Sequence, residues 1–163
     1  MQRVAIGVGS NTNRRQHIRQ GVRALQNQFG DVRCSPVYRT VAVGFDGPDF
    51  FNLACIFYTI LTPSELKVAL KSIECKEGRT QTEKQFASRT LDMDILLYGD
   101  EDLHSEGYDI PRKEITEEAY VLLPLSLLLV NEKHPLLNIT FREMWEQFDG
   151  SEVVLPKRLD WMP

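Results

Sequence analysis

The chain has 163 residues, of which 42% are hydrophobic and 26% are charged, as expected for one globular domain with a real core. Its net charge of −4 argues against broad binding to nucleic acid or anionic membranes, which needs a basic surface. The N-terminal segment lacks a signal peptide's apolar region, and no run reaches the length of a membrane span. We therefore predict a single domain over residues 1–163 without a nucleic-acid or membrane partner, and we expect a cytoplasmic monomer.

The first 60 residues are predicted to form a strand, a helix and two extended segments. Residues 3–9 are apolar and predict a short strand. From Ile18 to Phe29 apolar residues recur at helical spacing, which predicts an amphipathic helix. Residues 33–43 and 50–60 are predicted to be extended, because a loop rich in turn-forming residues separates two apolar runs.

A second helix is predicted to begin after Thr62, because this residue is a good N-cap and Pro63 and Glu65 suit the first and third helical positions. We expect the helix to end near Gly78. Residues 79–88 are polar without periodicity, which predicts a mobile loop that acts as a lid. The remaining predictions are a strand over 91–98, an irregular segment over 100–119, and packed helices over 119–130 and 141–148.

This order of elements matches the ferredoxin-like β-α-β-β-α-β plan with a C-terminal helical extension. The predicted fold class is α+β, an antiparallel sheet with helices packed on it. In this plan the first and last strands of the repeat are neighbours at the centre of the sheet. We therefore expect residues 91–98 to pair with residues 3–9, and a site to open on the face or edge that the main helices leave uncovered.

Two carboxylates, Asp92 and Asp94, interrupt the apolar strand. Residues two apart in a strand point to the same face, roughly 6–7 Å from each other. Such a pair repels itself unless a cation lies between, and Mg²⁺ typically binds one or two carboxylates together with substrate phosphates. Arg89, just before the strand, suits a phosphate oxygen. The pattern predicts a nucleotide-dependent phosphoryl-transfer site; the alternative is a solvated face of an exposed strand.

Other polar residues leave alternatives open. Asn52 lies in an apolar strand, where a buried amide is costly unless its hydrogen bonds are made, so it either bonds a neighbouring loop or binds a ligand. Glu74 is near the C-terminal end of the second helix, where the dipole disfavours anions, so it is either solvent-facing or functional. Cys34, Cys55 and Cys75 lack metal-ligand spacing and are predicted to be buried free thiols.

Motifs spread over nearly the whole chain occur together in one order and spacing. The most specific is the Ser-Arg-Thr-Leu-Asp-Met-Asp-Ile-Leu run at residues 88–96. The others lie at residues 9–11, 38–40, 48–52, 73–79, 110–111 and 120–125. On these motifs the chain resembles the 6-hydroxymethyl-7,8-dihydropterin pyrophosphokinases. That family transfers pyrophosphate from ATP to the pterin's hydroxymethyl group and releases AMP, in folate biosynthesis.

The resemblance implies a role for each matching residue. Asp92 and Asp94 would hold two Mg²⁺ ions that bridge ATP oxygens, and either Asp94 or the metal would help to deprotonate the attacking hydroxyl. The pterin would stack between two aromatic rings and be hydrogen-bonded at its edge. Its implied contacts are Phe50 and Tyr120 on the faces, and Asn52, Thr40 and Val43 on the edge. The implied ATP contacts are Glu74, Arg79, Arg89, Ile95 and Arg112, with Arg89 on phosphate as a catalytic residue.

The chain departs from the family pattern near the predicted phosphate site. Arg112 stands where the family usually has histidine, and Glu118 and Gln81 stand where it usually has arginine. Phe86 replaces a tryptophan of the loop. Loss of arginines removes donors to a triphosphate, while Arg112 and Lys113 supply charge from other positions. We expect weaker ATP handling or slower turnover; the alternative is a pterin- or nucleotide-binding homologue with reduced or lost catalysis.

Overall fold

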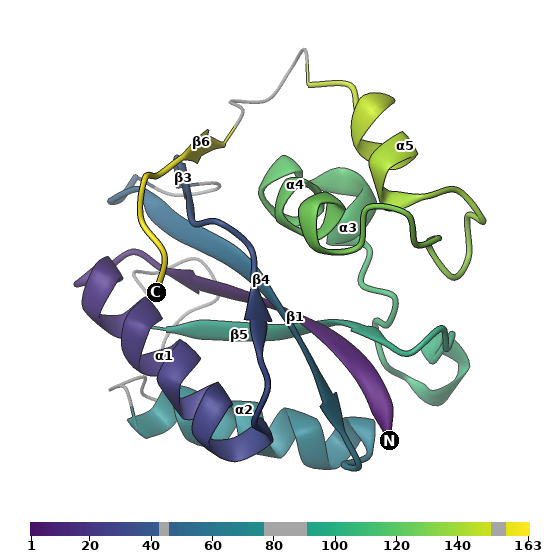
Figure 1. Cartoon of the computed structure of the whole chain (residues 1–163), viewed down its shortest axis with the longest axis horizontal. Coiled ribbons are helices and arrows are strands. Elements are labelled where there is room, and N and C mark those ends of the chain that lie inside the picture. Colours follow the sequence, from purple (N-terminus) through teal and green to yellow (C-terminus); the bar gives the residue numbers. More distant parts are fainter. Residues whose placement is uncertain (43–45, 77–90, 151–155) are drawn as a thin grey trace.

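The fold is an antiparallel sheet with helices on both faces (Figure 1). The computed structural model describes residues 1–42, 46–76, 91–150 and 156–163. Within these ranges the sheet has six strands, five of them in the order β5-β1-β4-β3-β6, and β2 also pairs with β4. The strands are β1 Gln2–Ser10, β2 Arg33–Cys34, β3 Tyr38–Thr40, β4 Phe50–Thr59, β5 Asp92–Tyr98 and β6 Lys157–Arg158. The predicted α+β, ferredoxin-like fold is confirmed, with β2 and β3 together in the place of one predicted strand.

Strand β1 lies between β5 and β4, so the predicted pairing of residues 91–98 with residues 3–9 is confirmed, but β5 is the last strand of the order and the prediction of a central position for it was wrong. Strand β1 pairs antiparallel with β4 along its whole length and with β5 on its other side. Its Val4, Ala5, Ile6 and Val8 side chains are almost completely buried, because helices cover both faces of the sheet here. The two aspartates of β5 are thereby placed beside the glycines of β1.

Helices α1 (Arg14–Phe29) and α2 (Pro63–Lys76) cover one face of the sheet, and α4 (Ala119–Leu128) with α5 (Phe141–Glu146) covers part of the other (Figure 1). Each face has its own hydrophobic core. Ile18 and Leu70 belong to the first core, and Leu122 belongs to the second. No helix in the described ranges is both long and apolar enough to cross a membrane.

The predicted extended segment 33–43 is broken after β2. Ser35 still pairs with β4, since its N–H donates to the Ala54 carbonyl at 2.9 Å and its hydroxyl accepts from the Ala54 N–H at 3.0 Å. Pro36 follows, and a proline has no N–H to continue a ladder. The chain resumes pairing only at β3, so one continuous strand was the wrong prediction for this segment.

The start of α2 is as predicted. The Thr62 N–H donates to Glu65 Oε2 at 2.8 Å, and the Glu65 N–H donates back to the Thr62 hydroxyl at 3.4 Å, which forms a capping box. The predicted end near Gly78 and the predicted lid over residues 79–88 lie outside the described residues.

Three short elements differ from the predictions. The segment 100–119, predicted to be irregular, contains the 3-10 turn η1 (His104–Glu106) and the helix α3 (Glu114–Glu117). Strand β6 has two residues and was not predicted. Elements of two to four residues are too short for hydrophobic periodicity to detect them.

The cysteines are free thiols in different surroundings. Cys34 and Cys55 are opposite each other on β2 and β4, with their sulfur atoms 3.3 Å apart. Cys55 is buried and Cys34 is half-buried, but Cys75 is exposed on α2. The prediction of a buried thiol was therefore wrong for Cys75.

Candidate active site

The two aspartates of β5 share one face of the sheet. Asp92 lies opposite Gly9 of β1 and Asp94 lies opposite Gly7. Both aspartates are half-buried, whereas the intervening Met93 is buried in the core under α1 and α2. Because successive strand residues alternate between faces, the carboxylates point to the side of α4. The strand thus presents two anions beside two residues that have no side chain.

Asn52 continues this row across the sheet. It lies opposite Gly9 on β4, so Asn52, Gly9 and Asp92 occupy three neighbouring strands. A Cβ atom at position 9 would lie only 2.7 Å from Asn52 Oδ1, which explains the glycine. The Asn52 amide nitrogen donates to the Thr40 hydroxyl at 2.7 Å. Asn52 is therefore held by a neighbouring strand with its oxygen over the glycine.

Glu74 supports the strand from behind. Its side chain is only 3% exposed, so a solvent-facing role is excluded. Its Oε1 accepts the Met93 N–H at 2.7 Å, and Lys71 Nζ lies 3.5 Å from Oε2. The buried carboxylate thus fixes the backbone between the two aspartates. A direct contact of Glu74 with ATP stays a prediction.

Arg112 is brought against Asp94 by the main chain. Its N–H donates to the Leu96 carbonyl at 2.9 Å, which docks the segment on the outer edge of β5. Its guanidinium nitrogens lie 3.3 Å from Asp94 Oδ1 and 3.0 Å from Glu114 Oε1. Burial disfavours the charge, but the carboxylates of Asp94, Glu114 and Asp109 together outweigh that effect and raise the pKa of Arg112. No sequence pattern pointed to Glu114, because its role depends on where this segment docks.

The two predicted stacking residues come from elements that pack together. Phe50 begins β4 and Tyr120 lies in the first turn of α4; both are half-buried, and α4 packs over β4. Burial, reinforced by Glu118 and Glu114, raises the pKa of Tyr120 to about 12. Burial and the charges of Glu114 and Glu117 also raise the pKa of Glu118. Tyr120 is therefore a neutral phenol, suited to a flat uncharged ring.

Some predicted site residues cannot be placed. Val43, Arg79 and Arg89 lie outside the described residues, as do Gln81 and Phe86. The Ile95 side chain is buried in the core under α1 and α2, so only its main chain is available to a ligand.

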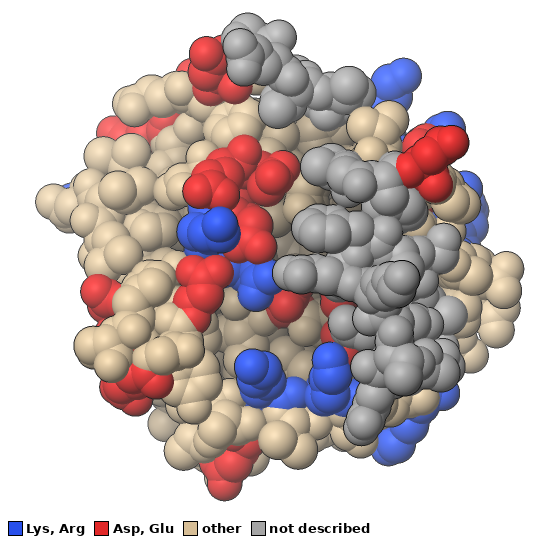
Figure 2. All heavy atoms as spheres, turned by 180° about the vertical axis from the view of Figure 1, so that it is seen from behind, with Lys and Arg blue, Asp and Glu red and all other residues tan. Residues whose placement is uncertain are grey.

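The two carboxylates fit a cation whose remaining ligands come from a bound substrate. Among the described residues, no group of three or more His, Cys, Asp or Glu side chains could hold a metal ion by itself. Two carboxylates on one face are the number that Mg²⁺ typically takes when phosphate oxygens complete its shell. Figure 2 shows charged side chains of both signs gathered around a hollow in the middle of one face of the molecule.

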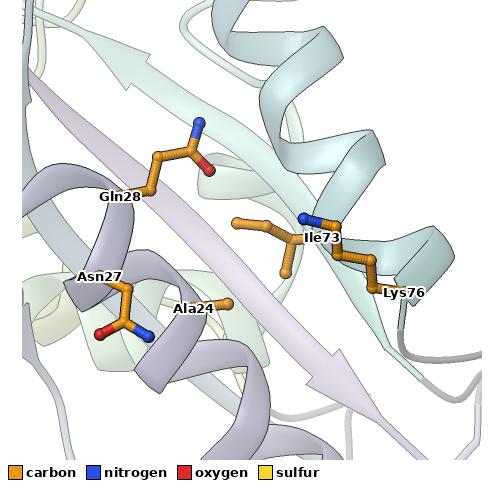
Figure 3. Close-up of a pocket in the computed structure, with 5 residues that line it drawn as sticks. All are labelled: Ala24, Asn27, Gln28, Ile73 and Lys76. Carbon is orange, nitrogen blue, oxygen red and sulfur yellow. The ribbon is translucent and has the colours of Figure 1, made fainter.

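Two other hollows lie on the side of the sheet covered by α1. One, of about 260 Å³, lies between α1 and α2, and Gln28, Ile73 and Lys76 point into it (Figure 3). The second, of about 500 Å³, lies at the start of α1, where Arg14 covers the ring of Phe51 at 4.4 Å. Neither has a carboxylate among its described lining residues, so neither resembles the site at β5.

Comparisons of the sequence with a family model and with known proteins point to the same family. The family model of 7,8-dihydro-6-hydroxymethylpterin-pyrophosphokinase (HPPK) matches residues 5–129. The chain is 37% identical to the 2-amino-4-hydroxy-6-hydroxymethyldihydropteridine pyrophosphokinase of Bacillus subtilis, over 89% of this chain and 91% of that protein. It is 36% identical to the Synechocystis enzyme of the same name, over 74% of this chain and 62% of that protein.

Larger proteins contain a similar unit. A folate synthesis bifunctional protein of Arabidopsis thaliana is 37% identical over 80% of this chain and 28% of its own length. The crystal structure of Plasmodium falciparum HPPK-DHPS has a TM-score of 0.68 at 15% identity, over 90% of this chain and 44% of that one. The chain thus spans less than half of these larger relatives, and the structural likeness at this identity concerns the fold.

Proposed function

Because the chain belongs to the 7,8-dihydro-6-hydroxymethylpterin-pyrophosphokinase family, we propose that it transfers pyrophosphate from ATP to 6-hydroxymethyl-7,8-dihydropterin and releases AMP. In this reaction the hydroxymethyl oxygen forms a bond to the β-phosphorus of ATP. The bond from that phosphorus to the oxygen it shares with the α-phosphorus breaks, and AMP leaves with the electron pair. The proton of the hydroxyl passes to Asp94 or to solvent.

One observation carries the proposal: Asn52, Gly9 and Asp92 lie in a row across three strands, with Asp94 next to it on the same face. Asn52 reads the edge of the pterin, while Phe50 and Tyr120 hold its faces. The ring then lies next to the aspartates, so its hydroxymethyl group is directed to the nucleotide. Holding both reactants in such an arrangement removes much of the entropic part of the barrier.

Asp92 and Asp94 would hold Mg²⁺, two ions of which would help to bind the nucleotide and neutralise the triphosphate charge. Glu74 keeps the two carboxylates in place through the Met93 N–H. Arg112, and Arg79 and Arg89 outside the described residues, supply positive charge to ATP. The chain has two arginines fewer than the family pattern, so we predict that its turnover is slower than that of its relatives.

The experiment is an AMP-release assay with Mg-ATP, with and without the reduced pterin. We expect AMP only when both substrates and Mg²⁺ are present. Asp92→Asn should lower the rate by at least about a hundredfold, because it removes half of the charge that holds the metal. Asp100→Asn is the matched control, since Asp100 is exposed just after the same strand. Pterin binding with no AMP at saturating Mg-ATP would contradict the proposal.

A further inference from the structure

The guanidinium of Arg112 lies between two carboxylates, one of which is a proposed cation ligand. Asp94 Oδ1 is 3.3 Å from Nη1, and Glu114 Oε1 is 3.0 Å from Nη2. The hydrogen bond from the Arg112 N–H to Leu96 anchors its main chain to the strand that carries Asp94. The guanidinium can therefore change partners while its backbone stays in place.

We propose that Arg112 is an exchangeable counter-ion of Asp94: it pairs with Asp94 when no divalent cation is bound and moves onto Glu114 when one is. The inference rests on the proposed function in that it takes Asp94 to be a cation ligand. Mg²⁺ binds oxygen at about 2.0–2.1 Å and carries two positive charges. A guanidinium next to the same oxygen repels that ion strongly, so one of the two must leave.

Glu114 offers the guanidinium a second place. Its Oε2 is buried and accepts no hydrogen bond from any residue that the structure describes. A buried acceptor without a donor is costly, and an arginine fork can bind both oxygens of one carboxylate. When Arg112 leaves Asp94, the Glu114 oxygen gains a donor. Glu114 is thus a positioning residue that acts on the metal site through Arg112.

The test measures cation binding in the absence of nucleotide and pterin. Free Mn²⁺ gives an electron paramagnetic resonance signal that is lost on binding, so a titration of the whole chain gives the Mn²⁺ affinity directly. Arg112→Met removes the competitor and should tighten Mn²⁺ binding roughly three- to ten-fold. Glu114→Gln removes the second carboxylate that contacts the guanidinium, so Arg112 stays on Asp94, and Mn²⁺ binding should weaken by a similar factor.

A neighbouring ion pair provides matched controls. Lys113 Nζ lies 3.9 Å from Glu117 Oε2, and both side chains are mostly exposed. Lys113→Met and Glu117→Gln make the same charge changes one and three residues away, without touching the proposed contact. We expect each of them to change Mn²⁺ affinity less than about twofold. Equal effects of Arg112→Met and Lys113→Met would overturn the proposal, because they would indicate a general charge effect.

An Asp94→Asn background completes the test. There Arg112→Met should no longer tighten Mn²⁺ binding, since the contested carboxylate is gone. An unchanged gain in that background, or no gain in the wild-type background, would contradict the inference. The AMP-release assay on the same proteins separates the two proposals. AMP release without an Arg112 effect on Mn²⁺ overturns only the counter-ion; the Arg112 effect without AMP release overturns only the activity.

Discussion

At the scale of single residues, buried polar groups hold the strand that carries the site. Glu74 is predicted to matter mainly through the Met93 N–H that it accepts at 2.7 Å. Glu74→Ala leaves that donor buried without its partner, which should lower the free energy of unfolding by about 1–3 kcal/mol. Glu74→Gln keeps an acceptor at the same position and should lose clearly less. Urea unfolding of the three proteins checks this, and equal stability of the alanine variant would contradict it.

His134 should make stability depend on pH. It is buried, and the Leu136 N–H donates to its Nδ1 at 3.2 Å, which requires an unprotonated nitrogen. Burial lowers the pKa of His134. The unfolded chain therefore takes up a proton near the ordinary pKa of about 6.5, where the folded protein does not. Stability should be complete above that pH and fall as pH drops below it.

The measurement is the free energy of unfolding in urea at pH 7.5 and 5.5, for the wild type and His134→Gln. The decline on acidification should be smaller in the variant, because glutamine does not titrate. His104 should contribute a pH dependence of stability with the opposite sign, since hydrogen bonding to Asp102 raises the pKa of His104. It is present in both proteins and cancels in the comparison. An identical decline in both would show that His134 does not contribute.

At the scale of elements, the close approach of β1 and β4 predicts a difference between two glycines of one strand. A Cβ at Gly9 would lie 2.7 Å from Asn52 Oδ1, whereas the atoms nearest to one at Gly7 are side-chain carbons of Leu96 at 3.6 Å, an ordinary contact. Gly9→Ala should displace the Asn52 amide from Thr40. Pterin binding should then weaken about tenfold or more, where a tenfold change corresponds to about 1.4 kcal/mol.

Gly7→Ala is the matched control and should leave pterin affinity nearly unchanged. Both variants should unfold close to the wild type, because the end of the Asn52 side chain can yield without moving the backbone. Fluorescence titration with pterin and thermal unfolding test both statements. A Gly9→Ala protein with normal pterin affinity would mean that Asn52 does not read the ring.

Whether the sequence could predict a feature depends on whether the signal for that feature is local. The helical spacing from Ile18 to Phe29 and the capping residues at Thr62 are local signals, and α1 and α2 follow them. The alternation of side chains along a strand is also a local signal, and it placed Asp92 and Asp94 on one face. The Arg112 contact with Asp94 depends on how a distant segment docks on β5, and no local pattern carries that information. The break between β2 and β3 was readable from Pro36, whereas the bonding of Ser35 to Ala54, which extends the pairing by one residue, was not.

At the scale of the whole molecule, both cores share one sheet, so they should unfold together as the single domain predicted from the sequence. The chain has two tryptophans, and their fluorescence reports on the two different faces of the sheet. Trp145 packs against the core under α4, and Trp161 packs against the core under α1. In Trp161→Phe and Trp145→Phe proteins, the fluorescence transitions in urea should each coincide with circular dichroism of the same protein.

A fluorescence midpoint that departs from the circular-dichroism midpoint of the same variant would indicate that one layer separates from the sheet first. The comparison within each variant matters, because the two substitutions change stability by different amounts. Coincident transitions in both variants would establish one cooperative unit over the described core.

Strand β5 ends the sheet, and a bare terminal strand invites pairing with a strand of another molecule. Here its outward N–H at Met93 is taken by the Glu74 carboxylate, and its carbonyl at Leu96 is taken by the Arg112 N–H. The two residues that arrange the acidic pair thus also close the border of the sheet. Loss of the Glu74 carboxylate should leave an unpaired N–H on this edge, so Glu74→Ala should aggregate more readily than the wild type, whereas substitutions of the Arg112 side chain keep its main-chain contact.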